Sequence, residues 1–312
     1  MEYETAREII DCLPSDRTLY HYFKDYYAVC LLRRELESLG IRRIAQLKQS
    51  RFASLTTKPV IREILAGQGN GEIPVEGFEP VWPEMYETYV LTLGVWGGPQ
   101  RHFAAQTSRP GVNLVLQLNF SERHDQMFRR CIGKERDMFN YTCHPISALK
   151  TTLAWARIDL DFSSNEALIE EIQNDWLRDS DQLLRFYQLA AARKQRSFYY
   201  FGRTIEIDRA YSYFHDEINR HRKIWSEAML NAALGFLLDE IGIGTIYYHS
   251  HVTGAAVKGI YYSKPPRSLY SKLPGQFCFE KANTAPEFLI NDKHSRRRLR
   301  KIKKQLWYRM EN

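Results

Sequence analysis

The clearest pattern in the chain is an alternation of apolar and polar residues near its middle. Leu153 to Phe162 (LAWARIDLDF) alternates with a period of two, which predicts a strand. The next four residues, SSNE, are typical of a hairpin loop. Ala167 to Trp176 (ALIEEIQNDW) then predicts a second strand, with three carboxylates and two amides within six positions. Buried charges are costly unless they are paired or hydrogen-bonded, so this strand forms either one edge of a site or a structural network.

The length of the hairpin loop decides which side chains meet. With a four-residue loop, Phe162 pairs with the first residue of the second strand, and Glu171 and Gln173 lie on the apolar face. Asp159 then faces Glu170. A loop one residue longer or shorter places Asp159 and Asp161 on the face of Glu171, Gln173 and Asp175 instead. The sequence leaves both alternatives open.

Similar patterns predict an α+β fold with a mixed, mostly antiparallel sheet flanked by helices. We expect three regions: a helical N-terminal region (residues 1–70), an α+β core domain (71–292) and a basic C-terminal tail (293–312). A cleft is expected from the strands at 112–120, 153–162 and 167–176. The other predicted strands are Tyr89–Trp96 and Thr245–Ser250, and the predicted helices are Thr5–Cys12, Arg17–Leu39, Lys58–Leu65, 177–195 and 208–241.

The charge of the chain is concentrated at its C-terminal end. The formal net charge is +7, but residues 293–312 carry nine Lys or Arg against one Glu, which gives +8 and leaves the rest at −1. This segment is a candidate for contacting the phosphates of a nucleic acid. The alternative is a solvated terminal helix that ends on Leu306 and Trp307. The densest cations are Arg296, Arg297, Arg298, Arg300, Lys301, Lys303 and Lys304.

Composition excludes several classes of protein. No apolar run approaches eighteen residues and no charged-apolar-small leader is present, so we expect neither a membrane span nor secretion. The five cysteines are odd in number and lack CxxC spacing, which favours reduced thiols over disulfides or a zinc site. These features predict a cytoplasmic protein, and none of them names a cofactor.

One acidic pattern resembles a nuclease core. With Asp159 and Glu171 on one face, the order Asp followed by Glu-x-Gln on the next strand is similar to the catalytic core of PD-(D/E)XK nucleases in which Gln replaces Lys. The resemblance implies that Asp159, Glu171 and Gln173 bind Mg²⁺ and activate water against a phosphodiester. The structural alternative is that Glu171 and Gln173 form internal hydrogen bonds or pair with Arg157.

The same strand resembles a domain of large phage polyvalent proteins. ALIEEIQNDW is similar to the IEEIQSDW-type strand of that domain, which is followed by an amphipathic helix, a Gly, a short strand and a Tyr-x-x-x-Leu-Pro-like motif. Residues 225–250 and SLYSKLP at 268–274 stand in the corresponding places. The resemblance implies an association with phage and names no reaction.

The segment from Met229 to Phe279 resembles the last third of a GNAT acetyltransferase, with a long helix, a strand, a second helix and an LYSKLPGQFCF turn similar to the LYEKLGF type. This resemblance implies that the long helix begins near RHRKIWSEAM. Glycines that would let a pyrophosphate approach are missing there, so only three cations would attract phosphates. They are Arg220, Arg222 and Lys223.

Three functions follow from these patterns. The leading hypothesis is a GNAT-like protein, either an atypical N-acyltransferase or a non-catalytic derivative. In the catalytic version Glu171 is the general base, with its pKa raised by an apolar face. The alternatives are a metal-dependent nuclease that uses Asp159, Glu171 and Gln173, and a nucleic-acid-associated accessory protein without catalysis.

Overall fold

The structure is a computed structural model that describes residues 1–12, 18–40, 43–73, 78–98, 106–133, 139, 141–260 and 266–312. Arg17, where a helix was expected to begin, lies outside these residues. Within the described part of the chain, no helix combines the length and apolarity that crossing a membrane requires.

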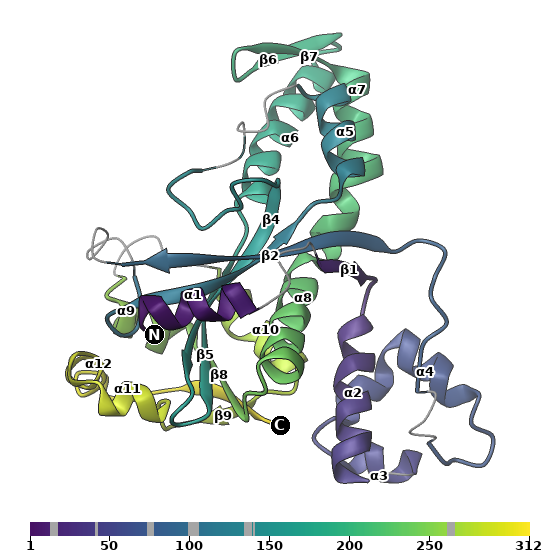
Figure 1. The fold of residues 1–312 in the computed structure, drawn as a ribbon. Helices are drawn as coiled ribbons and strands as arrows, with labels where there is room; N and C mark the ends of the chain where they lie inside the picture. Colours follow the sequence, from purple (N-terminus) through teal and green to yellow (C-terminus); the bar gives the residue numbers. More distant parts are fainter. Residues whose placement is uncertain are drawn as a thin grey trace.

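An eight-stranded mixed sheet organises the chain, which confirms the α+β class (Figure 1). Its strand order is β1-β2-β3-β4-β5-β8-β10-β9. All neighbouring pairs are antiparallel except β5 and β8, whose parallel pairing requires a long crossover. The strands are β1 (Thr18–Tyr22), β2 (Glu87–Gly97), β3 (Val112–Asn119), β4 (Thr152–Asp161), β5 (Glu166–Gln173), β8 (Thr245–His249), β9 (Glu280–Ala282) and β10 (Trp307–Glu311).

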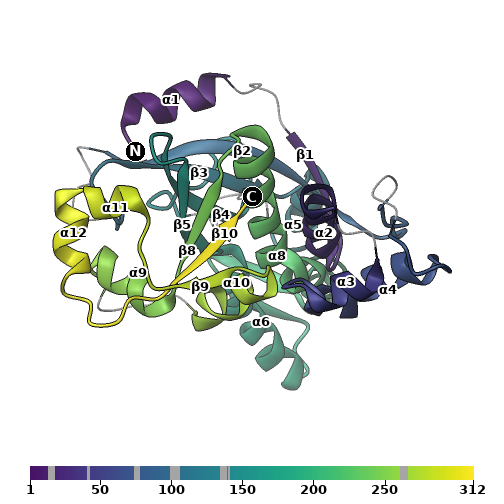
Figure 2. The same cartoon turned by 90° about the horizontal axis from the view of Figure 1, so that it is seen from below.

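Helices cover both faces of this sheet (Figure 2). Neighbouring residues of a strand point to opposite faces, so Ile169 of β5 joins the larger apolar core and Leu168 joins a smaller one. The larger core includes α1 (Tyr3–Cys12) and α8 (Asn219–Gly235), and the smaller one includes residues of α9 (His251–Lys258), α11 (Glu287–Asn291) and α12 (Lys293–Leu299).

The remaining helices belong to the N-terminal region, to the crossover from β5 to β8 and to two shorter connections. The N-terminal ones are α2 (Tyr26–Leu39), α3 (Ile44–Gln49) and α4 (Pro59–Ala66). The crossover from β5 to β8 runs through α6 (Trp176–Ala192), a small hairpin and α7 (Ile207–Ser212) before α8. The other elements are α5 (Glu122–Cys131), α10 (Lys272–Gln276), β6 (Ser197–Tyr200) and β7 (Arg203–Glu206).

The helix predicted from Arg17 to Leu39 is half wrong. Thr18–Tyr22 forms β1, which pairs with β2 over five residues, and α2 begins only at Tyr26. Asp25 separates the two elements because its φ of 67° lies in the left-handed region. The short TLYHY run has a strand-like alternation, and pairing at the sheet edge decides its conformation.

The C-terminal basic segment is built into the fold. The boundary expected at residue 293 falls just before α12, and the chain then returns as β10 between β8 and β9. On α12, Ser295 and Leu299 are buried, whereas most of its cations are exposed. Removing residues 293–312 would therefore remove an inner strand of the sheet.

A β-bulge sets the faces of the acidic hairpin. Leu160, and not Phe162, pairs with Ala167, so the predicted turn register is wrong. Between Arg157 and Ile158 the register shifts again, because β5 contains one extra residue. Arg157 consequently pairs with Glu171, and Trp155 pairs with Gln173. Of the two alternatives, the structure therefore shows Glu171 and Gln173 on the face of Asp159 and not on the apolar face, although the bulge and not the loop length is the cause.

Candidate functional site

Asp159 is held by positive groups from the N-terminal part of the chain. Its carboxylate is buried and accepts hydrogen bonds from Arg109 Nε (2.8 Å) and Nη2 (3.0 Å) and from the Met1 amine (2.7 Å). Arg109 Nη1 also reaches Asp161 at 3.3 Å. Within the described residues, no hydrogen bond or shared ion-pair partner joins Asp159 to Glu171.

Glu171 is one member of a buried group of four charges. Arg157 Nη2 donates to Glu171 Oε2, and Lys258 Nζ lies 3.8 Å from the same oxygen. Lys258 also donates to the backbone carbonyl of Glu170 (3.0 Å), and all four side chains are buried. The two carboxylates thus balance two cations, as the structural alternative of pairing with Arg157 predicts.

This environment does not suit Glu171 as a general base. Burial alone raises the pKa of its carboxyl, but the charges of Arg157 and Lys258 together outweigh burial and leave the pKa below its usual value. The expectation of a raised pKa on an apolar face is therefore wrong. An ionised carboxylate that already binds two cations is a poor proton acceptor.

Glu170 anchors the loop that precedes β3. Its carboxylate accepts the Ser108 N–H and the Ser108 hydroxyl, both at 2.8 Å, and lies 3.1 Å from His249 Nε2. Burial raises the pKa of Glu170, but the hydrogen bond from His249 and nearby cations lower it to about 2. Ser108 also lies 2.8 Å from the same His249 nitrogen, so these residues do not form the Ser-His-acid relay of a hydrolase, in which the two ring nitrogens have different partners.

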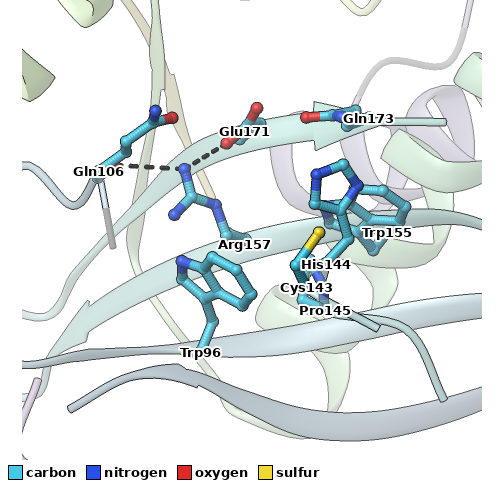
Figure 3. Close-up of a pocket in the computed structure, with 9 residues that line it drawn as sticks. All are labelled: Trp96, Gln106, Cys143, His144, Pro145, Trp155, Arg157, Glu171 and Gln173. Carbon is cyan, nitrogen blue, oxygen red and sulfur yellow. Dashed lines mark hydrogen bonds and ion pairs between the residues drawn. The ribbon is translucent and has the colours of Figure 1, made fainter. Parts of the chain in front are cut away.

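A pocket of about 310 Å³ opens beside the bulge, on the face that carries Arg157 and Glu171 (Figure 3). Trp96 of β2 and Trp155 of β4 line it, and Gln173 lies at the end of β5. The loop before β4 closes it from the other side. That loop contributes Cys143, His144 and Pro145, and Gln106 completes the lining.

His144 is oriented by a buried carboxylate at this pocket. Its Nδ1 hydrogen-bonds to Asp175 Oδ2, and its ring lies 5.6 Å from that of Trp155. Asp175 directly precedes α6 and is also held by Arg178 (2.8 Å) and Gln173 Nε2 (3.3 Å). His144 Nε2 makes no hydrogen bond to another residue within the described part of the chain, and the side chain is 30% exposed. This nitrogen is therefore available to a molecule in the pocket.

Nothing in the sequence pattern singles out His144. Asp175 was expected on one face with Glu171 and Gln173 in one of the two hairpin alternatives, and His144 lies in a loop 31 residues earlier. The available signal was a His within a Cys-His-Pro loop that precedes a strand of the acidic hairpin. Such a signal is common in proteins, and only the folded loop brings the histidine to Asp175.

The cations expected to hold phosphates lie in the middle of a helix. From Ile207 to Glu240 the chain is continuously helical, through α7, a π-helical turn, α8 and a second π-helical turn, so the expectation that the long helix begins near Arg220 is wrong. No free N–H groups of a helix start are available there. Arg220 donates to Glu217 (2.9 Å), and Arg222 donates to Asp181. Lys223 is exposed and makes no ion pair with the described residues.

The described residues offer no ready set of ligands for a metal ion. Among the residues that the structure describes, no three His, Cys, Asp or Glu side chains gather closely enough to hold a metal ion. Asp159, Glu171 and Gln173 share a face of the hairpin but have different partners. Asp159 binds Arg109, Glu171 binds Arg157, and Gln173 contacts Asp175.

No family model matches the chain, and the searches of curated proteins and of solved structures found no match either.

Proposed function

We propose that the pocket beside the bulge is the active site of a GNAT-like N-acyltransferase, with His144 as the general base. The observation that carries this proposal is the pair of His144 and Asp175 at the pocket. A carboxylate on Nδ1 fixes the ring and its tautomer, which leaves Nε2 to accept a proton from a bound molecule.

The lining of the pocket suits an amine with a flat or apolar body. Trp96 and Trp155 offer ring faces that attract both apolar groups and cations. Glu171 and Arg157 line the same pocket as a paired carboxylate and guanidinium, so they add polar groups and no net charge. An amine held there would lie among groups that first bind its charged form and then remove a proton.

The proposed reaction is acyl transfer from a thioester. His144 Nε2 takes one proton from the ammonium, the freed nitrogen attacks the thioester carbonyl carbon, and the C–S bond breaks. As the tetrahedral intermediate collapses, its nitrogen gives up a second proton, which the leaving thiolate takes up, while the proton on His144 passes to solvent; the products are an amide and a thiol. In this scheme His144 replaces Glu171 as the base, and Glu171 lines the pocket.

The order of C-terminal elements supports this assignment. The long helix α8 is followed by β8, then by the second helix α9 and by the LYSKLPGQFCF segment, as the acetyltransferase resemblance implies. Arg220 and Arg222 have no part in the proposal, because both are engaged by carboxylates. The nuclease alternative has weaker support, since Asp159 and Glu171 are each held by an arginine.

The test is release of free thiol from acetyl- and longer acyl-CoA thioesters in the presence of a panel of aromatic and alkyl amines, with mass spectrometry of the amide. His144→Ala and Asp175→Asn should each lower turnover by about 100-fold or more. His215→Ala is the matched control, because His215 also pairs with a carboxylate, Asp216 (3.0 Å), but is exposed and lines none of the described pockets. Equal activity of His144→Ala and the control would rule out His144 as the base.

A further inference from the structure

We infer that a second, larger cleft on the same face of the sheet binds a small molecule that carries adjacent phosphate groups. The cleft has a volume of about 750 Å³ and lies between the loop Gln106–Gly111, the end of α9 and the helix α12. In Figure 2, α12 and α9 lie next to each other at one edge of the molecule. This inference is independent of the proposed acyl transfer.

Cations of α12 form one wall of the cleft. His294, Arg298 and Lys301 are spaced four and three residues apart, which places them on one side of the helix and of the turn that follows. Ser295 and Leu299 occupy the buried side. The basic run identified in the sequence therefore divides into cations that face the cleft and cations, such as Arg297, that lie outside its lining.

The cleft has an excess of positive charge. Arg109 and Lys258 also line it, but Asp159 and Glu171 compensate their charges. Arg298 and Lys301 have no carboxylate partner within the described part of the chain, and none of the described lining residues is acidic. A concave surface with uncompensated cations concentrates field lines and attracts anions.

Arg298 is positioned to bind an anion. Its Nη1 donates to the Val257 carbonyl (2.7 Å) near the end of α9, which fixes the side chain. The other guanidinium nitrogens make no hydrogen bond to the described residues. A planar guanidinium with free N–H groups suits the paired oxygens of a phosphate. Arg298 and Lys301 together offer two positive charges without a carboxylate partner to adjacent phosphate groups.

Buried hydrogen bonds hold the two walls of the cleft together. The Ser295 hydroxyl of α12 donates to the Ser108 carbonyl (3.0 Å), and Ser108 in turn donates to Glu170. The next residue in the chain, Arg109, is fixed by its hydrogen bonds to Asp159. The cleft is thus preorganised, and a ligand would not need to order it on binding.

The size of the cleft favours a small ligand over a nucleic acid strand. Its volume lies in the range of small-molecule sites. Its walls are the loop Gln106–Gly111, the end of α9 and the helix α12. Nucleic acid would instead be attracted by all the exposed cations of the segment, inside and outside the cleft alike. Binding of a small phosphate ligand should therefore depend on the cations that line the cleft, whereas binding of a nucleic acid should depend on all the exposed cations of the segment.

The experiment is isothermal titration calorimetry of the full chain with pyrophosphate, tripolyphosphate, ATP and a single-stranded 20-nucleotide DNA. We expect tripolyphosphate or ATP to bind, with at least a tenfold loss of affinity in Arg298→Gln and in Lys301→Gln. Arg297→Gln, which removes the same charge outside the cleft, should change affinity less than twofold. Tighter binding of ATP than of tripolyphosphate would identify a nucleotide, and equal binding would identify the phosphate chain alone.

Two results would overturn the inference. One is no binding of pyrophosphate, tripolyphosphate or ATP at millimolar concentration. The other is binding of the DNA alone, with equal weakening by Lys301→Gln and Arg297→Gln, which would indicate a nucleic-acid surface. The far-UV circular dichroism and melting temperature of each variant are measured first. His144→Ala should leave phosphate binding unchanged, so failure here and failure of the acyltransferase proposal are distinguishable.

Discussion

The buried charge cluster around the bulge makes a quantitative prediction for Glu171→Gln. In the native protein Glu170 and Glu171 balance Arg157 and Lys258, and all four side chains are buried. Glutamine keeps the size of the side chain but removes one negative charge, so one positive charge remains uncompensated. Breaking a buried ion pair in this way costs about 3 to 5 kcal/mol of unfolding free energy.

This loss converts into a measurable change in melting temperature. With an unfolding entropy of about 2.1 cal/mol/K per residue, a chain of 312 residues should melt roughly 5 to 8 °C lower in Glu171→Gln than in the wild type. The double variant Glu171→Gln/Lys258→Met removes one charge of each sign and should recover part of the loss. Differential scanning calorimetry at pH 7 measures the wild type, Glu171→Gln, Lys258→Met and the double variant.

A surface control separates burial from charge removal. Glu206 pairs with Arg209 at 2.9 Å, and both side chains are well exposed, so solvent screens the pair and Glu206→Gln should change stability by at most about 0.5 kcal/mol. If Glu171→Gln melts within a degree of wild type, or if the double variant is less stable than the sum of its single changes predicts, the charge-balance argument fails.

The pH dependence of this effect has a definite sign. The pKa of Glu171 is depressed in the folded protein, so its stabilisation is present above the unfolded-state value and is lost as the pH falls. The difference between wild type and Glu171→Gln should therefore shrink as the pH drops below about 4.3, the usual value for glutamate. A difference that grows in acid would contradict the lowered pKa.

Two further predictions concern packing and titration. A Cβ at Gly254 would lie 2.9 Å from His249, so Gly254→Ala should lose about 1 to 3 kcal/mol of stability in urea unfolding. A Cβ at Gly275 meets nothing within 4 Å, so Gly275→Ala should be neutral or slightly stabilising. Equal effects of the two variants would argue against a tight contact at Gly254. Burial lowers the pKa of His124 to about 4. Between pH 6.5 and about 4 the unfolded chain therefore binds a proton at this residue that the folded protein does not bind, so stability falls as the pH falls. His124→Phe should flatten this decline, and an unchanged slope in urea midpoints measured from pH 7 to pH 4 would refute the assignment.

Local patterns in the sequence were sufficient for the main strands and for the fold class. The alternation in Val112–Phe120 and Leu153–Phe162 reports one residue in two facing a core, and this periodicity is a property of the extended backbone itself. Gly242 and Gly244 lie between the helix predicted at 208–241 and β8, and glycine is typical of such a helix end. Each of these inferences needed only neighbours along the chain.

Tertiary structure decided which chemistry the hairpin presents. The bulge in β5 moves Glu171 opposite Arg157, and no rule for loop length could place this extra residue, because it depends on pairing with both neighbouring strands. For the same reason the TLYHY segment became a strand only because the edge of β2 was available.

The candidate site illustrates the same division. The sequence by itself determined that ALIEEIQNDW would carry an unusual density of polar groups and that positive charge would gather in the last twenty residues. Only the folded chain brought His144 to Asp175 and fixed α12 against the loop at Ser108, because such contacts join segments 31 and 187 residues apart. Composition records how many charges a chain has, whereas packing decides which of them face each other and which remain free for a ligand.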